Sequence, residues 1–230
     1  TANLATTIIN DVLDENDEKF VVTISNPNTN VSLGNNTTHT YTIQDNDNPP
    51  TIQFNATALN EDEGTNGALK VDVSAASGKD ITVDYAIQAA STAIGGGTDY
   101  TLANGTATIT AGNTTTNIAL TVVNDALYEN NETIVISASN PTESSMGANT
   151  TFTYTISNVN GNDDKPTIQF NQTTDTALES VTSFNIQLDL SAAAGLTSTV
   201  DYALTAGNPA ATGGGTDYTL ADGTATIAAG

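Results

Sequence analysis

The sequence predicts an all-β protein built from tandem antiparallel immunoglobulin-like β-sandwiches. Long segments recur at a nearly fixed spacing, apolar residues alternate with polar ones over short runs, and Gly- and Asn-rich turn signals separate these runs. Alternation is typical of strands that bury one face, and helix signals are essentially absent. About seven short strands are expected in each repeat.

Self-comparison defines the repeat. PTIQFN at 50–55 returns at 166–171, VDYA at 83–86 returns at 200–203, and GGGTDYTL at 95–102 returns at 213–220. The offsets are 116, 117 and 118 residues (166 − 50, 200 − 83 and 213 − 95). We therefore expect three units, which are the C-terminal half of one repeat (1–47), a complete repeat (48–163) and the N-terminal half of another (164–230).

The strands of the complete repeat follow from period-two alternation, because successive side chains of a strand point to opposite faces. Apolar residues occupy the alternate positions 69–73, 81–87, 118–122, 134–136 and 152–156. Turn signals lie at Gly95-Gly96-Gly97, Asn104-Gly105 and Ala111-Gly112-Asn113.

The charge balance excludes several classes of function. The chain has 26 Asp and Glu against 4 Lys and Arg, a formal net charge of −22. Such a surface repels phosphate backbones and anionic lipids, so we expect no nucleic-acid partner and no membrane insertion in this segment. The chain contains no Cys, which excludes disulfides and thiolate metal sites. No signal peptide is visible, and we expect the sequence to be a window on a longer chain.

Enzymatic chemistry finds little support. The lone His39 lies in a strand between threonines, so no Ser/His/Asp set can be assembled. Paired carboxylates could cleave glycosides, but the chain has no Trp to form a sugar platform. We predict that the protein is not an enzyme.

Carboxylates gather where strands of the complete repeat end. The segments concerned are 61–63, Asp99, 124–132 and 163–164. Grouping this many carboxylates at one pole of a sandwich is costly without a cation, and calcium prefers six to eight oxygen ligands. The sequence therefore predicts a calcium site at this pole.

The order of motifs resembles the Calx-beta domain. Glu63-Gly64, VDY at 83–85, GTDY at 97–100 and Asn-Asp-x-x-x-Glu-x-x-Glu at 124–132 occur in that order, before an Asp-rich end. Calx-beta domains occur in sodium/calcium exchangers, in an integrin subunit and in very long bacterial surface proteins. The resemblance covers the whole chain as half, whole and half repeats.

The resemblance implies a calcium-ligand set in each unit. For the complete repeat, it implies Glu63, Asp99, Asn124, Asp125, Glu129 and Glu132, with Asp163 or Asp164 at the exit. For the first half-repeat, it implies Asp11, Glu15, Glu18, Asp45 and Asp47, and for the third unit Glu179 and Asp217.

Two features qualify this set. Asn158 and Asn160 stand where the first half-repeat has Asp45 and Asp47, so we expect fewer or weaker ions there unless Asp163 and Asp164 substitute. The aspartates of the two GTDY turns could instead serve only as turn caps.

We interpret the chain as calcium-binding stalk repeats of a giant secreted cell-surface adhesin, used in biofilm formation, adhesion or gliding motility. The expected partners are calcium, neighbouring repeats, and an unknown surface or cell ligand contacted through other regions. The alternatives are a ligand- or glycan-binding module and a regulatory calcium sensor. The half-repeats are expected to continue into a longer chain, and the other possibility is that they pair between molecules.

Overall fold

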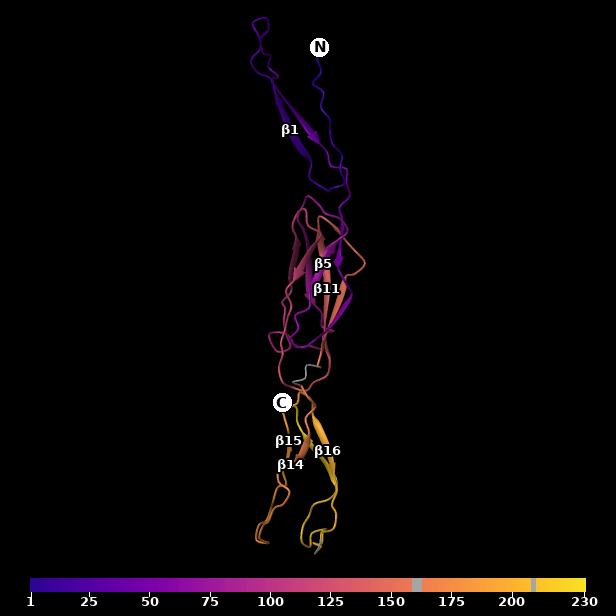
Figure 1. The fold of residues 1–230 in the computed structure, drawn as a ribbon, viewed down its shortest axis with the longest axis vertical. Helices are drawn as coiled ribbons and strands as arrows, with labels where there is room; N and C mark the ends of the chain where they lie inside the picture. The colour runs from indigo at the N-terminus through magenta and orange to yellow at the C-terminus, as the bar shows by residue number, and fades with distance from the viewer. Residues whose placement is uncertain (159–162, 208–209) are drawn as a thin grey trace.

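The computed structural model describes residues 1–158, 163–207 and 210–230. These residues form strands, turns and irregular segments, and none of them lies in a helix that could cross a membrane. The molecule is a long rod (Figure 1), with the first half-repeat at one end, the complete repeat in the middle and the third unit at the other end. The predicted all-β, tandem-sandwich fold is confirmed.

The complete repeat is a sandwich of two sheets. The five-stranded sheet has the order β4 (Ala58–Asp62), β13 (Thr151–Ser157), β11 (Glu132–Thr142), β6 (Ile81–Ile87) and β8 (Gly105–Ile109). The four-stranded sheet has the order β12 (Ser145–Met146), β3 (Thr51–Phe54), β5 (Leu69–Val73) and β9 (Thr115–Ile118). A short pair, β7 (Tyr100–Thr101) and β10 (Thr121–Val122), closes one end.

The core lies between these sheets and follows the predicted alternation. Phe54, Leu69, Ile134 and Tyr154 are fully buried, and the intervening residues of their strands are exposed or half-buried. Burying such a side chain contributes about 1.5–3 kcal/mol. The sandwich is therefore held together mainly by the apolar residues that the period-two pattern indicated.

The structure departs from the predicted strands in three places. Residues 118–122 form two strands in different sheets, because the chain crosses from β9 to β10 between Ile118 and Thr121. Gly105 begins β8 and lies against the Tyr85 ring, although a turn was expected there. Two pairs, β12 with β3 and β13 with β4, are parallel, so the sandwich is not wholly antiparallel.

The parallel pair β4–β13 positions the acidic pole. Because the two strands run in the same direction, their C-terminal ends meet at one end of the sandwich. Glu63 N donates to Ser157 O there (3.1 Å). β11 is antiparallel to β13, so Glu132 at its start reaches the same pole.

The flanking units keep part of the same pairing. β1 (Glu18–Thr23) pairs with β2 (Thr38–Ile43) in the register of β11 with β13. β14 (Ile168–Phe170) pairs with β15 (Leu188–Leu190) as β3 pairs with β5. β16 (Ser198–Tyr202) pairs with β17 (Gly223–Ile227) as β6 pairs with β8.

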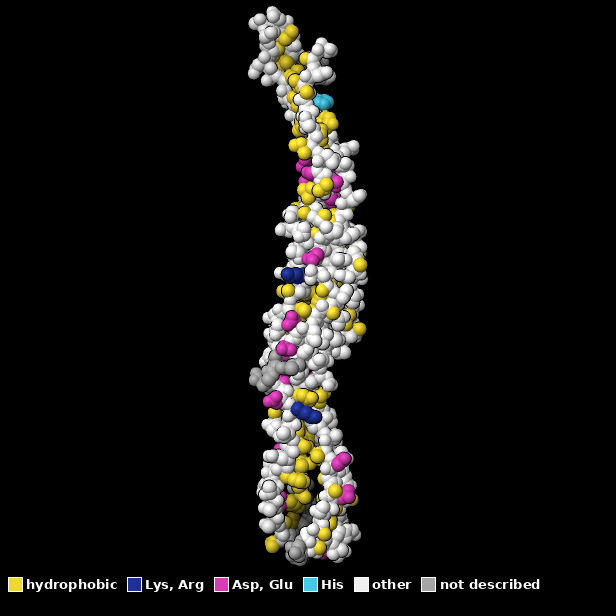
Figure 2. Space-filling model, turned by 45° about the vertical axis from the view of Figure 1, so that its right-hand side comes forward, with side chains coloured by type: hydrophobic (Ala, Val, Ile, Leu, Met, Phe, Trp, Pro, Cys, Tyr) yellow, Lys and Arg dark blue, Asp and Glu magenta, His cyan; other side chains and the backbone are white. Residues whose placement is uncertain are grey.

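These flanking units lack the strands that would cover them. Tyr41 is 41% exposed and Phe170 is 54% exposed, whereas the corresponding Tyr154 and Phe54 of the complete repeat are fully buried. Figure 2 shows apolar side chains on the surface of both flanking regions. Residues 172–187 carry no strand, whereas the corresponding β4 of the complete repeat pairs with β13.

Candidate metal centre

The acidic pole of the complete repeat collects carboxylates from four separate segments. Glu63 follows β4, Asp99 precedes β7, Asp125 and Glu129 lie in the loop between β10 and β11, and Glu132 begins β11. We call this group, together with Asp163, the central pole. The sandwich brings these side chains together although the first and last are 100 residues apart (163 − 63).

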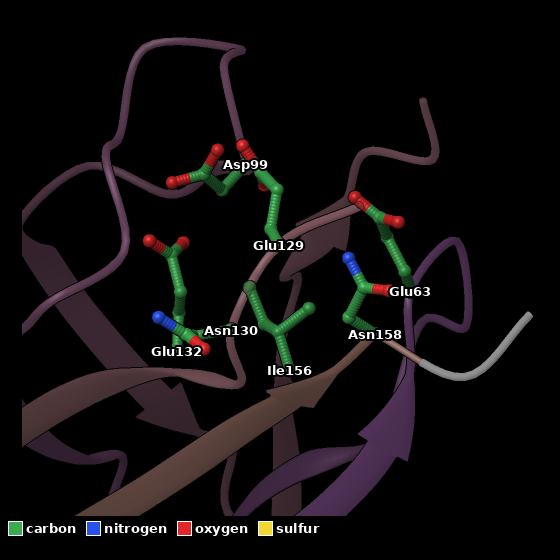
Figure 3. Close-up of a pocket in the computed structure, with 7 residues that line it drawn as sticks. All are labelled: Glu63, Asp99, Glu129, Asn130, Glu132, Ile156 and Asn158. Atoms are coloured by element: carbon green, nitrogen blue, oxygen red, sulfur yellow. The ribbon is translucent and has the colours of Figure 1, made fainter. Parts of the chain in front are cut away.

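Three of these carboxylates are close enough to share one ion. One oxygen each of Glu63, Asp125 and Glu129 lies within 4.8 Å of the others. Figure 3 shows the adjoining small pocket, with Glu63, Asp99 and Glu129 around its mouth. The pocket is lined by Glu63, Asp99, Glu129, Asn130, Glu132, Ile156 and Asn158. The polar side chains of the pocket can coordinate a metal through carboxylate or amide oxygens, which suits a hard divalent cation.

The side-chain pKa values record how unfavourable this grouping is. Burial, with the charges of Asp125 and Asp163, raises the pKa of Glu63 to about 7. Burial, with Asp99 beside it, raises the pKa of Glu132 to about 7. Burial and Asp125 also raise the pKa of Glu129. Without a cation, the pole would have to hold protons to relieve its own repulsion.

Asp163 shows the same conflict most clearly. It is 7% exposed, and among the described residues no N–H donor reaches either of its carboxylate oxygens. It faces Glu63, and a hydrogen bond between the two carboxyl groups requires a proton on one of them. Asn158 Oδ1 nearby is also buried without a donor. A bound ion would satisfy these oxygens without a proton.

The 124–132 loop is shaped by its own side chains. Asp125 Oδ1 accepts a hydrogen bond from Leu127 N at 2.8 Å, an Asx turn that leaves the other oxygen for a ligand. Asn124 is exposed and packs against Gly64, whose φ is +73°. An added Cβ at Gly64 would lie 2.8 Å from Asn124 Cβ, so the Glu63-Gly64 pair keeps this approach open.

Asp99 caps its turn and also lines the pocket, so the cap does not remove it from the candidate ligands. One of its carboxylate oxygens accepts a short hydrogen bond from Ile94 N, which caps the glycine-rich turn. The same carboxyl group lines the pocket and interacts with Glu132. Asp217 repeats the cap, accepting from Thr212 N at 2.6 Å.

The first half-repeat gathers its own acidic group, which we call the first pole. Leu13 N donates to Asp11 Oδ1 at 3.0 Å, as Leu127 does to Asp125. Burial raises the pKa of Glu15, and the charges of Glu18, Asp11, Asp45 and Asp47 raise it further. The structure thus brings the five residues that the resemblance named in this unit into one electrostatic group.

The remaining candidates lie apart. Asp164 is exposed beside the buried Asp163. Glu179 is exposed in a turn, and Asp217 is exposed on another loop, so the third unit shows no assembled pole among the described residues. Asn160 lies outside the described residues.

Asn130 and Asn158 line the pocket but were not among the predicted ligands. Asn130 lies between Glu129 and Glu132 in the sequence, and Asn158 stands where the first half-repeat has Asp45. Asn158 Nδ2 donates to Leu127 O at 3.0 Å and so ties the end of β13 to the acidic loop. Asp14, Ser77 and Lys79 were also missed, because their contacts join different repeats. Only the acidity of Asp14, three residues after Asp11, could have drawn attention to this group.

Comparison with protein families fits this arrangement. The model of the Calx-beta domain matches residues 1–47, 45–160 and 161–230. The chain belongs to the Calx-beta family. No curated protein matches the sequence significantly.

Solved structures similar to this Calx-beta chain include the apo-form Calx CBD1 domain. It is 18% identical, covers 48% of this chain and 98% of its own, and has a TM-score of 0.44. The calcium binding domain CBD12 of CALX1.1 is 20% identical, with 77% of this chain and 70% of its own covered and a TM-score of 0.44.

Proposed function

We propose that the chain is a calcium-binding spacer, a row of Calx-beta sandwiches in which ions occupy the acidic poles. At the central pole, Glu63, Asp125 and Glu129 would hold the first ion. Glu132, Asp99 and Asp163 surround them and offer further oxygens. A bound divalent ion supplies positive charge, so the buried carboxylates need no protons.

The observation that carries this proposal is the closeness of Glu63, Asp125 and Glu129 oxygens within 4.8 Å. Two unit charges 4 Å apart repel by about 4 kcal/mol at an effective dielectric constant of about 20. A solubility role would spread such charges over the surface, where they cost little. Their concentration in a half-buried pocket favours coordination.

The position of the poles suggests what the ions do. Glu129 of the central pole lies over Gly195 of the following unit, and Glu15 of the first pole lies over Gly78. An ion that fixes either glutamate would therefore also stiffen the contact between successive units. This is a structural rather than a catalytic role.

We extend the proposal to a stalk of an extracellular, cell-surface adhesin, secreted or attached to an outer membrane. The domain units that we propose are 1–47, 48–163 and 164–230. The near-identical segments, the rod-like arrangement and the net charge of −22 support a soluble spacer that projects a binding region elsewhere in the protein. The adhesion ligand would be contacted by that other region.

The test is thermal unfolding of the chain with excess calcium and with chelator, repeated for Asp125→Ala. Ligand binding to the folded state alone stabilises it by about 2.7 kcal/mol at one hundred times the Kd, so calcium should raise Tm by several degrees. Asp125→Ala should remove most of this rise, and the matched control Asp175→Asn, an exposed charge in another unit, should keep it.

Identical curves with calcium and with chelator would overturn the metal assignment and leave an acidic spacer. The stalk role has a separate measurement, which is small-angle scattering of the calcium-loaded chain. A maximum dimension that shrinks to that of a collapsed, flexible chain would contradict it, whatever the unfolding curves show.

A further inference from the structure

Consecutive units meet through the same backbone contact at both junctions. An isolated parallel bridge joins Asp14 to Ser77 at the first junction and Tyr128 to Ala194 at the second. These positions correspond by the repeat offsets of 114 (128 − 14) and 117 (194 − 77). At both junctions the acidic loop of one unit therefore docks on a loop of the next, which lies between β5 and β6 in the complete repeat and between β15 and β16 in the third unit. We call the latter, 75–80 and 192–197, the docking loop.

The backbone hydrogen bonds also repeat. Gly78 N donates to Asp14 O at 2.9 Å, and Gly195 N donates to Tyr128 O at 3.1 Å. On the other side of the docking loop, Gly112 N donates to Ser77 O at 2.8 Å at the first junction, and Gly230 N donates to Ala194 O at 3.0 Å at the second. Two occurrences of one geometry in a single chain indicate a defined interface rather than a chance contact.

The glycine of the docking loop allows a close approach of the preceding glutamate. A Cβ at Gly78 would lie 2.8 Å from Glu15 Cγ, and a Cβ at Gly195 would fall within 2.5 Å of Glu129 Cγ. Real Cβ atoms essentially never come this close to another heavy atom. The glutamate side chain of the preceding acidic loop thus packs directly against the backbone of this glycine.

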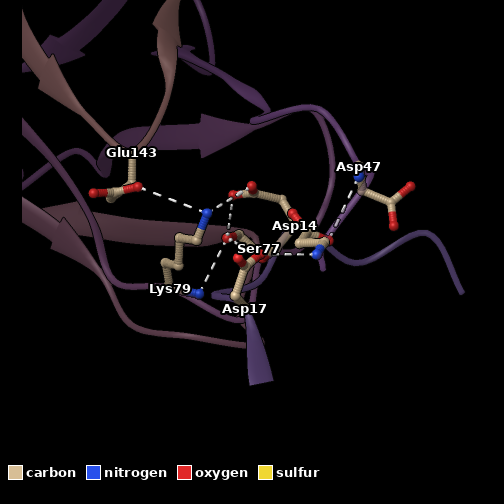
Figure 4. Close-up of polar contacts among 7 residues, drawn as sticks. Asp14, Asp17, Asp47, Ser77, Lys79 and Glu143 are labelled. Atoms are coloured by element: carbon tan, nitrogen blue, oxygen red, sulfur yellow. Dashed lines mark hydrogen bonds and ion pairs between the residues drawn. The ribbon is translucent and has the colours of Figure 1, made fainter. Parts of the chain in front are cut away.

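The side chains of the two junctions differ in kind. Figure 4 shows the first junction, where Lys79 Nζ pairs with Asp14 Oδ1 at 2.9 Å. Ser77 Oγ lies 3.0 Å from both Asp14 O and Asp14 Oδ2 and accepts from Lys79 N at 3.1 Å. Asp14 is 3% exposed and Ser77 is 1% exposed, so this polar group is buried between the units.

The second junction replaces the whole polar group. Tyr128 takes the place of Asp14, Ala194 that of Ser77, and Leu196 that of Lys79. Ala194 is 3% exposed, and Tyr128 and Leu196 are half-buried. Three positions therefore change together from a charged, hydrogen-bonded set to a mostly apolar one.

We propose that the docking loop is a recognition surface for the acidic loop of the preceding repeat, and that its side chains form two junction types that are not interchangeable. Asp14 against Ala194 and Leu196 would bury a carboxylate without a partner. Tyr128 against Ser77 and Lys79 would leave the buried Ser77 hydroxyl without its acceptor, and the half-buried Lys79 ammonium with only Glu143, 3.9 Å away. A matching pair avoids both penalties, so the junction type determines which repeat can follow which.

This inference goes beyond calcium binding and does not depend on it, because Asp14, Ser77 and Lys79 belong to neither ligand set. The chain has no Cys, so spin labels can be placed on Thr42→Cys and Thr108→Cys, two exposed positions on either side of the first junction. Electron–electron distance distributions then report how firmly the units are docked, both in chelator and in calcium.

Asp14→Tyr alone should broaden the distribution at least twofold, and Ser77→Ala with Lys79→Leu should do the same. The triple variant, which carries the second junction's side chains on the first, should restore a narrow distribution. Circular dichroism and the unfolding transition of the central sandwich should stay unchanged, which separates undocking from unfolding.

Single variants as narrow as the native chain would overturn the recognition role of these side chains. A triple variant as broad as the single ones would overturn the matching of types. If Asp14→Tyr prevents folding, the reciprocal set at the second junction gives the same test, with Tyr128→Asp alone and then combined with Ala194→Ser and Leu196→Lys.

Discussion

The first pole and the central pole share an acidic loop but differ in what surrounds it. Asp11 and Asp125 form the same Asx turn, and Glu15 and Glu129 occupy the same position above a glycine of the next unit. The pKa of Glu63 at the central pole is raised to about 7 by burial and by the charges of Asp125 and Asp163. Residues 1–47 correspond to the second half of a repeat and include no position equivalent to Glu63. The sequence motif thus forms the acidic loop by itself. The rest of the sandwich buries the carboxylates, which makes their negative charges unfavourable.

The largest expected effect is a pH dependence of the ion-free central repeat. Glu63 and Glu132 have pKa values of about 7 in the folded chain against about 4.5 when unfolded, so the folded state binds more protons between these values. Their contribution to the unfolding free energy is present below pH 4.5 and lost as pH rises through 7. The two together should contribute on the order of 3 kcal/mol, after a discount for solvent screening.

Urea unfolding in chelator at pH 5 and pH 8 measures this difference. Saturating calcium should abolish it, because the ion replaces the protons. Glu63→Gln should reduce the pH dependence by roughly half, and Glu18→Gln in the exposed first pole should leave it intact. Equal stability of the repeat at both pH values in chelator would show that the ionised Glu63 and Glu132 do not destabilise the ion-free central pole.

The next effect compares equivalent glutamates of the two poles. Glu129→Gln removes one charge from a group that includes Asp125 and Asp163, so it should stabilise the ion-free chain by about 1 kcal/mol. It should also weaken calcium binding by about tenfold, which corresponds to about 1.4 kcal/mol. Glu15→Gln should change ion-free stability less, because that side chain is more solvated.

Calorimetric titration and chelator-state unfolding of both variants check this comparison. Equal effects of Glu129→Gln and Glu15→Gln would show that burial by the first half of a repeat does not distinguish the poles. A tighter-binding Glu129→Gln variant would remove Glu129 from the ligand set.

The sequence was sufficient for the fold class because alternation and repetition are local signals. The strand runs of β5, β6, β11 and β13 could be read directly from period two. The parallel pairing of β4 with β13 could not, because nothing local distinguishes a parallel partner from an antiparallel one. That pairing is what carries Glu63 to the pole.

Part of the candidate site could be predicted from the sequence. The resemblance named Glu63, Asp125 and Glu129, whose oxygens the structure brings within 4.8 Å. It could not indicate that Asp163 is buried while Asp164 is exposed, since both follow the same strand and differ only in the direction they face. The junction residues were missed because their meaning depends on a neighbouring unit.

A smaller effect concerns the asparagine that distinguishes the two poles. Asn158→Asp would give the central repeat the carboxylate that Asp45 supplies to the first. The change loses the donation from Asn158 Nδ2 to Leu127 O, so ion-free stability should fall by about 1 kcal/mol. Calcium affinity should rise severalfold, because an additional charge faces the ion.

Asn131→Asp is the matched control, since Asn131 Oδ1 accepts from Asn158 N at 3.2 Å and an aspartate keeps that bond. This variant adds the same negative charge near the acidic loop but leaves the residues that line the pocket unchanged. If both variants raise calcium affinity equally, net charge rather than ligand identity separates the poles.

The smallest expected effect lies in the glycines beneath the glutamates. Gly195→Ala should displace Glu129 from its place at the central pole, and Gly78→Ala should displace Glu15 from the first, each at less than about 1 kcal/mol because a glutamate side chain can move. Each should lower calcium affinity only at its own pole, by a few-fold, in calorimetric titration. Gly34→Ala, which has open space around the added methyl group, should change neither. Unchanged affinity in both glycine variants would mean that ion binding and docking are independent, even though they share these two glutamates.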